Sequence, residues 1–281
     1  MRVRFLPEIF EKLKNFYYNI FMKTKEKILK TLKEHEALVR KIYPDATILG
    51  TFLYGSQNYK IDTPESDVDT ITIVVPSFSD LIFKEPISKQ LIMPAGTHGH
   101  CVVKDIRKIV EQWKKQSLNF LEILFTDYYI INPTFQEDWD EFLDEREFIA
   151  RMDLDKAIKS ISAQAINTYL KNKTDKKYQA NALRLFFFLQ DLILWKPYKE
   201  CLISHHDLVY KVKTGECESP YKGDFVYQLN MFIDKHTGSR FFPDRETMNF
   251  LDSVLYEIIR KNALSELNGE DDYGSETKNC S

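Results

Sequence analysis

The sequence predicts an α/β (α+β) fold, in which a mixed sheet with flanking helices is followed by a helical C-terminal half. Short segments rich in β-branched residues occur only in the first half of the chain. Apolar residues at helical spacing dominate the second half. The chain has 281 residues, of which 43% are hydrophobic, so it is long enough to bury a substantial core.

The first half, residues 1–131, is expected to be the α/β core with N-terminal helices. From Glu8 to about Tyr43, apolar residues recur at three- and four-residue steps, which predicts one or two amphipathic helices. Three strands are predicted, at 46–54, 69–75 and 100–104, and helical spacing follows at 106–116 and 119–125.

The remainder of the chain is divided by composition. Residues 132–152 are acidic and interrupted by Pro133, and we expect a crossing segment there. Residues 153–266 are predicted to form a helical domain. Residues 267–281 have little apolar content, which predicts a disordered acidic tail.

Charge and cysteine usage limit the classes of function. The formal net charge is −3, from 39 basic and 42 acidic residues, so a polyanionic partner would need a local basic patch. The four cysteines are scattered and predict neither a structural zinc site nor a disulfide framework. Together with an N-terminus that lacks a signal-peptide core, this predicts a cytoplasmic protein. The most apolar segment, 183–195, is too short to cross a bilayer and contains two charged residues, which predicts a core helix and no membrane partner.

Two acidic residues precede the second predicted strand. If Asp67 and Asp69 belong to the strand, their side chains project on the same face, roughly 6 to 7 Å apart along the chain. Two close carboxylates repel one another unless a cation lies between them, and Mg²⁺ bound by one or two carboxylates takes its other ligands from water and phosphates. The alternative is a pair of solvated charges at a strand edge.

A Gly-Ser pair ends the first predicted strand. Gly55 allows the backbone to approach a phosphate closely, and the Ser56 hydroxyl with nearby N–H groups can bind its oxygens. Asn58 belongs to the turn that follows and is a further candidate for nucleotide binding.

The stretch YGSQNYKIDTPESDVDTITIVV, residues 54–75, resembles the signature of the DNA polymerase beta nucleotidyltransferase superfamily. Its TPESDVD heptad is most similar to the predicted nucleotidyltransferases of the RNA-repair-pathway polymerase-beta family. The resemblance extends to residues 105–125 and 181–193. It implies a polymerase-beta-like sheet, Gly55 and Ser56 as ligands of a nucleoside triphosphate such as ATP, and Asp67 and Asp69 as ligands of Mg²⁺ or Mn²⁺.

The superfamily commonly uses a third carboxylate on a neighbouring strand, and the predicted strand HCVVK lacks one. Asp105 is the nearest candidate for this catalytic role, but it precedes a helical pattern and is also suited to cap that helix. His100 is a candidate metal ligand or base, or a histidine at a strand edge.

Lys177, Asn181 and Arg184 fall at positions i, i+4 and i+7 of a predicted helix, and so share one face. We expect Lys177 and Arg184 to meet the outer phosphates of the nucleotide, unless this face is only the solvated side of the helix. Lysine clusters at 171–177 and 108–115 are candidate contacts for RNA.

These observations predict a metal-dependent nucleotidyltransferase that transfers a nucleoside monophosphate from a triphosphate to an acceptor hydroxyl. The family name suggests an RNA end as the acceptor. A protein or a small molecule as acceptor remains an alternative, as does a catalytically degenerate nucleotide-binding or regulatory protein, because the third acid is missing.

Overall fold

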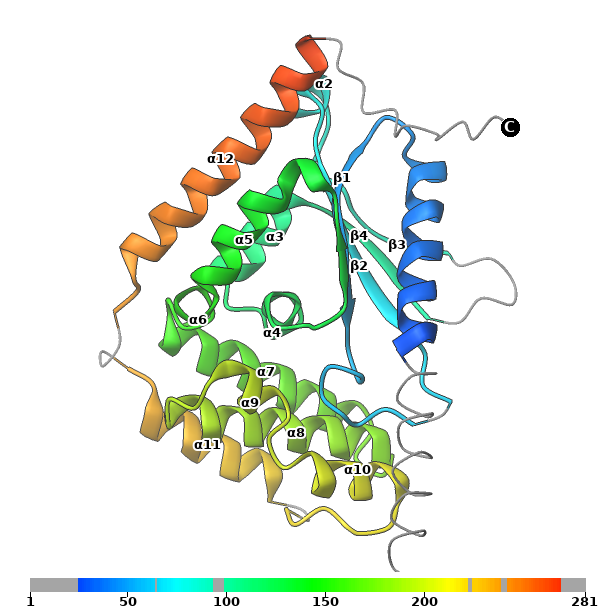
Figure 1. The fold of residues 1–281 in the computed structure, drawn as a ribbon. Helices are drawn as coiled ribbons and strands as arrows, with labels where there is room; N and C mark the ends of the chain where they lie inside the picture. The colour runs from blue at the N-terminus through cyan, green and yellow to red at the C-terminus, as the bar shows by residue number, and fades with distance from the viewer. Residues whose placement is uncertain (1–24, 64, 93–98, 222–223, 239–241, 269–281) are drawn as a thin grey trace, which may run out of the picture.

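The computed structural model describes residues 25–63, 65–92, 99–221, 224–238 and 242–268 (Figure 1). Within them, the predicted N-terminal helical region appears as one helix over residues 25–42. The part predicted for residues 8–24 and the tail at 269–281 lie outside the described residues.

The sheet has five strands in the order β3-β4-β2-β1-β5. The strands are β1 (Thr47–Tyr54), β2 (Asp69–Val75), β3 (Ser88–Leu91), β4 (Cys101–Asp105) and β5 (Tyr129–Ile131). β2 and β4 are parallel, whereas the other neighbours are antiparallel. The sheet is therefore mixed, as predicted.

The three predicted strands correspond to β1, β2 and β4. The other two strands, β3 and β5, were missed by the sequence prediction. β3 has four residues, of which three are exposed, and β5 has only three residues. Both lie at the edges of the sheet, where less of the strand is buried.

Helices cover both faces of the sheet (Figure 1). On one face, Ile48 and Val74 pack against Val39 from the helix at 25–42. On the other face, Phe52 and Ile71 belong to a core that continues through the helical half. Alternation separates Ile71 from Val74 in β2, because they are three residues apart and successive residues of a strand point to opposite faces. In β1 an irregularity between Ile48 and Gly50 shifts the alternation, so Ile48 and Phe52 face opposite sides.

The helices that follow the strands are short in the sheet half and longer after it. They are α2 (Phe78–Phe83), α3 (Ile106–Lys114), α4 (Leu118–Leu121), η1 (Glu122–Leu124), η2 (Pro133–Phe135), α5 (Gln136–Asp144), α6 (Arg146–Ile149), α7 (Leu154–Lys171), α8 (Lys176–Ile193), α9 (Tyr198–Leu202), α10 (His206–Thr214), α11 (Phe225–His236) and α12 (Arg245–Leu267). α7 and α10 both pack against α8, whereas α12 returns to contact α3 and α5 beside the sheet (Figure 1).

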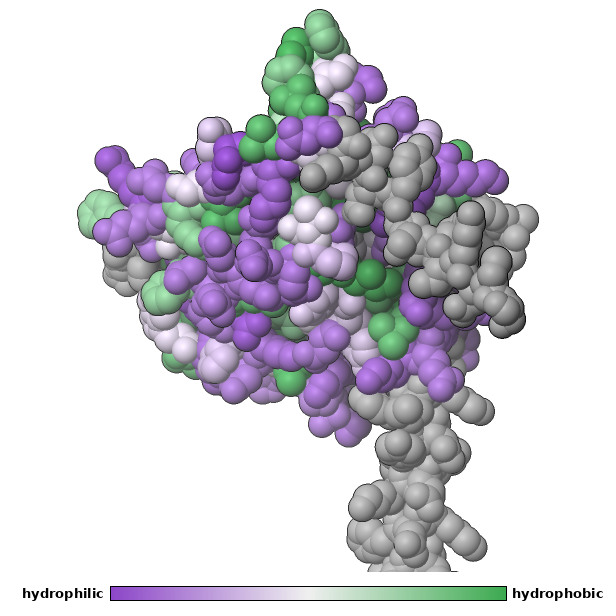
Figure 2. Space-filling view, turned by 45° about the horizontal axis from the view of Figure 1, so that its top comes forward, coloured by the Kyte–Doolittle hydropathy of each residue, from purple (hydrophilic) through white to green (hydrophobic). Residues whose placement is uncertain are grey.

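The surface in Figure 2 is mainly hydrophilic, with apolar residues in small groups. Large apolar side chains such as Trp113, Trp139 and Phe188 are buried instead. In the described part of the chain, no helix combines the length and the apolar character that crossing a membrane requires.

Candidate active site

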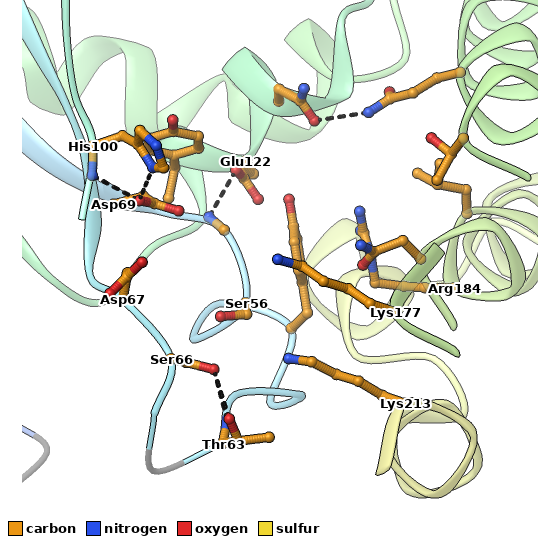
Figure 3. Close-up of a pocket in the computed structure, with 18 of the residues that line it drawn as sticks. Ser56, Thr63, Ser66, Asp67, Asp69, His100, Glu122, Lys177, Arg184 and Lys213 are labelled. Atoms are coloured by element: carbon orange, nitrogen blue, oxygen red, sulfur yellow. Dashed lines mark hydrogen bonds and ion pairs between the residues drawn. The ribbon is translucent and has the colours of Figure 1, made fainter. Parts of the chain in front are cut away.

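A pocket of about 470 Å³ lies where one end of the sheet meets the helical half (Figure 3). The sheet register determines which strand ends reach it. Tyr54 at the end of β1 pairs with Asp69 at the start of β2, and Thr70 pairs with Cys101 at the start of the parallel strand β4. The end of β1 and the starts of β2 and β4 therefore open at the same end of the sheet.

The turn after β1 brings Gly55 and Ser56 to this pocket. Gly55 has a φ of +97°, a left-handed conformation that glycine adopts readily and other residues rarely adopt. Backbone hydrogen bonds close the turn, from the Asn58 N–H to the Gly55 carbonyl (3.0 Å) and from the Tyr59 N–H to the Ser56 carbonyl (3.2 Å). Both residues predicted to bind phosphate thus lie at the cavity.

Asp67 and Asp69 line the sheet side of the same pocket (Figure 3). β2 begins at Asp69, so Asp67 lies before the strand and strand alternation does not orient its side chain. His100 contacts Asp69 twice: its backbone N–H donates to Oδ1 at 2.9 Å, and its ring Nδ1 lies 3.0 Å from the same oxygen. A histidine directly before β4 therefore stands beside the acidic pair, near the strand on which a third carboxylate was expected.

The two carboxylates supply the hard oxygen ligands that Mg²⁺ and Mn²⁺ prefer. Among the described residues, no group of three or more His, Cys, Asp or Glu side chains is arranged to hold a metal ion. The donor set of Asp67 and Asp69 therefore fits an ion that takes further ligands from water and bound phosphate. It does not fit a structural metal held entirely by protein side chains.

The structure does not bring Asp105 to the pocket. Asp105 pairs with Val74, four residues along the ladder from the pair of Thr70 and Cys101, which is roughly 13 Å at the usual rise of a strand. Its carboxylate accepts the backbone N–H of Arg107 at 2.8 Å and two guanidinium hydrogen bonds from the same residue. Asp105 is therefore the N-cap of α3, and the geometry gives no support to a catalytic role.

Asn58 also lies away from the cavity lining. Its amide nitrogen donates to the Leu53 carbonyl at 3.1 Å, and its amide oxygen accepts the Thr126 hydroxyl at 2.8 Å. These bonds join the turn after β1 to the segment before β5. The residue therefore supports the Gly-Ser turn from behind, rather than facing a ligand.

α8 contributes Lys177, Asn181 and Arg184 to the wall of the pocket opposite the carboxylates (Figure 3). The helical spacing of these residues predicted that they share a face, and they do. Arg184 is only 6% exposed, and its guanidinium carbon lies 3.6 Å from the centroid of the Tyr59 ring. This cation–π contact fixes the cation at the pocket.

Lys213 from α10 is a further cation of the pocket, and the sequence prediction missed it. Its Nζ donates to the Ile61 carbonyl at 2.6 Å. Burial lowers the pKa of Lys213, the charge of Lys177 lowers it further, and Asp62 opposes the shift. The sequence does not single out Lys213 as a pocket residue, because Lys211 on the same helix is an equally plausible cation.

Glu122 is the second residue that the sequence prediction missed. It is fully buried, and one of its oxygens accepts the Gly55 N–H at 3.1 Å. Burial raises the pKa of Glu122 to about 8, although Tyr59 and Arg184 both act to lower it. A sequence signal did exist, because Glu122 is the single acid in the apolar run FLEILF.

Among the comparisons with known proteins, only the search of solved structures gives matches. No family model matches the chain, and no curated protein matches it either. Among solved structures, the chain is similar to a nucleotidyltransferase-like protein from Exiguobacterium sibiricum, with 8% sequence identity and a TM-score of 0.32. The similarity covers 86% of this chain and 81% of that protein. At this identity and TM-score, the similarity is no basis for assigning an activity to this chain.

Proposed function

We propose that this protein is a metal-dependent nucleotidyltransferase, which transfers a nucleoside monophosphate from a nucleoside triphosphate to an acceptor hydroxyl and releases pyrophosphate. The observation that carries the proposal is a single pocket with opposite charges on its two walls. Asp67 and Asp69 form one wall, the cations of α8 and α10 form the other, and the Gly55-Ser56 turn lies between them. This arrangement suits a polyphosphate bound together with a divalent cation.

Each wall has its own part in binding. The triphosphate accepts hydrogen bonds from the Ser56 hydroxyl and from the turn, while Lys177 and Arg184 neutralise its outer phosphates. Asp67 and Asp69 would hold Mg²⁺ or Mn²⁺. When bound, that ion would neutralise charge on the phosphate under attack.

His100 is the candidate base for the acceptor hydroxyl. Its ring is oriented by Asp69 through Nδ1, which leaves the second ring nitrogen to accept a proton. We propose an RNA end as the first acceptor to test, because Lys171, Lys173 and Lys176 lie close in sequence to Lys177, which lines the pocket. RNA binding through such lysines weakens steeply with salt, and salt-insensitive binding would contradict this choice of acceptor.

The test is transfer of label from each α-³²P-labelled nucleoside triphosphate, with Mg²⁺ or Mn²⁺, to RNA, to total cellular protein or to the protein itself. We expect label transfer by the wild type and loss of at least about a hundredfold in Asp67→Asn and Asp69→Asn, because each variant removes a negative ligand. Asp140→Asn is the matched control, since Asp140 is an exposed acid on α5 away from the pocket. Equal transfer by all four proteins would contradict the proposal.

A second candidate is a nucleotide-binding protein without transferase activity. It is favoured by one observation, that β4 is preceded by His100 and offers no carboxylate beside Asp69. The two candidates differ in the same experiment. Nucleotide binding that is abolished by Asp67→Asn, without any label transfer to the acceptors, would select the second candidate.

A further inference from the structure

A buried cluster of Glu122, Tyr59 and Arg184 lies at the Gly-Ser turn, and Arg184 also belongs to the cationic wall of the pocket. Glu122 is fully buried and accepts the Gly55 N–H, and Tyr59, in the same turn region, is 5% exposed. The guanidinium carbon of Arg184 lies over the Tyr59 ring, 3.6 Å from its centroid. A carboxyl, a phenol and a guanidinium thus meet directly under the residue whose left-handed turn faces the pocket.

Arg184 has donors that the protein does not use. Its Nε and Nη1 atoms are buried, and no described residue accepts a hydrogen bond from either. Unpaired donors on a buried cation are costly, and native proteins rarely leave them so. Because Arg184 lines the pocket, these donors point to an anionic ligand with oxygen acceptors (Figure 3).

We propose that Glu122 is a positioning residue for this phosphate site. It fixes the Gly55 N–H and provides the buried carboxyl next to which Tyr59 and Arg184 are oriented, so that the free Arg184 donors bind an outer phosphate of the nucleotide. The inference rests on the proposed function, because it assigns the outer phosphates of the same nucleotide to these donors. Glu122 is neither of the two proposed metal ligands, although the charge of Asp69 acts on its carboxyl.

The charge of Glu122 decides how well the site accepts a phosphate. The groups that face its carboxyl are Tyr59, Arg184, Asp69, Tyr54 and Tyr198, of which only Arg184 is cationic. Since burial raises the pKa of Glu122 to about 8, the carboxyl is mainly neutral at pH 7 and can accept the Gly55 N–H without repelling phosphate. At pH 9 it is mainly ionised, and the negative charge opposes the phosphate and competes for Arg184.

The experiment is calorimetric titration with inorganic tripolyphosphate and Mg²⁺ at pH 7, 8 and 9. For the wild type, we expect the Kd to rise about tenfold between pH 7 and pH 9, because the binding-competent neutral form falls to roughly a tenth of the population. Glu122→Gln keeps an uncharged acceptor of similar shape, so it should bind as the wild type does at pH 7 and more tightly at pH 9. Any smaller fall that remains in Glu122→Gln belongs to Lys213, whose pKa is also lowered by burial.

Glu65→Gln is the matched control, because Glu65 is an exposed carboxylate at the edge of the pocket. It should keep the pH dependence of the wild type. Glu122→Ala should weaken binding at every pH, provided that circular dichroism shows it folded; if it does not fold, Glu122→Gln decides alone. A Glu122→Gln protein whose affinity falls as steeply as that of the wild type would overturn the inference, and so would a wild type that binds no tripolyphosphate at any pH.

The outcome is separable from that of the proposed function. The expected binding pattern without label transfer would support the role of Glu122 and contradict the transferase. Label transfer together with a pH-independent difference between the wild type and Glu122→Gln would support the transferase and contradict the role of Glu122.

Discussion

At the scale of single residues, two aspartates at opposite ends of the neighbouring parallel strands β2 and β4 have different roles. Asp69 begins β2 at the pocket and is fixed by His100. Asp105 ends β4 at the other end of the sheet, is 2% exposed, and is saturated by hydrogen bonds from Arg107. A carboxylate with all of its partners inside the fold contributes to stability, whereas one that faces a cavity is available to a ligand.

Asp105→Ala should therefore reduce stability without affecting the pocket. We expect the free energy of unfolding to fall by about 1–3 kcal/mol, because the cap of α3 is lost and the Arg107 guanidinium loses its partner. Urea denaturation checks the stability, and calorimetry checks the nucleotide Kd. Asp69→Asn should do the reverse, with little change in stability and a large loss of binding. A folded Asp105→Ala protein with impaired nucleotide binding would bring back the catalytic interpretation of Asp105.

Some pocket residues could be predicted from sequence because local spacing determines their placement. Gly55 and Ser56 are adjacent, and the helical period places Lys177 and Arg184 on one face. The lone acid in FLEILF marks Glu122 as unusual, but the placement of Glu122 and Lys213 at the pocket could not be predicted, because each reaches it only through packing of segments far apart in the chain. The Gly55 N–H and Glu122 are separated by 67 positions, and the Lys213 Nζ and the Ile61 carbonyl by 152.

At the scale of elements, burial decides which strands the sequence reveals. β1 and β2 are buried along nearly their whole length and carry continuous β-branched and apolar runs. β3 is polar and pairs only along one edge of β4, and β5 has three residues that begin shortly after η1. Their strand conformation depends on pairing with a neighbouring strand, so the local sequence pattern does not predict it.

Gly99 shows how the entry to a strand controls the site. It has a φ of +103°, and a Cβ atom at this position would collide with the Val68 carbonyl. The chain passes this close to Val68 just before His100 contacts Asp69. Gly99→Ala should therefore push His100 away from Asp69.

We expect Gly99→Ala to lower label transfer by about tenfold or more, since a misplacement on the order of 1 Å at a reacting group has large effects. Gly215→Ala is the matched control, because Gly215 also has a positive φ, of +83°, but has open space around its missing side chain. Gly215→Ala therefore also places a side chain at a positive φ, but it causes no steric collision. Equal activity in the two variants would show that the Gly99 approach does not position His100.

At the scale of the whole molecule, one hydrophobic core joins the sheet half to the helical half. It includes Phe52 and Ile71 of the sheet, Phe188 of α8 and Ile258 of α12. α12 comes after the helices that line the pocket, yet it packs on α3 and α5 beside the sheet (Figure 1). The chain thus returns to its first half, and the two walls of the pocket are held by the same core.

Two polar contacts of α12 also join it to the first half of the chain. The Asn262 amide donates to the Pro76 carbonyl at 3.1 Å, directly after β2, and Lys261 pairs with Asp138 of α5 at 2.5 Å. Both partners of the ion pair are at least partly buried, which makes it less exposed to solvent screening than a surface pair. The first contact joins α12 to the segment directly after β2, the strand that begins with Asp69, and the second joins α12 to α5.

The continuous core predicts that both halves unfold together. Ile258→Ala removes a fully buried side chain from α12, and we expect it to lower the free energy of unfolding by about 2–5 kcal/mol. Trp195, just after α8, is replaced by Phe in all proteins of this test, so that urea-induced changes in tryptophan fluorescence report on the buried Trp113 and Trp139 of the first half. Far-UV circular dichroism reports mainly on the helices. The two signals should change in one coincident transition, and Ile258→Ala should shift both equally.

Tyr256→Ala is the control, since Tyr256 lies on the same helix and is 63% exposed. If the circular dichroism and fluorescence transitions separate in the wild type, the halves are independent units, and the pocket between them depends on their docking rather than on a shared core.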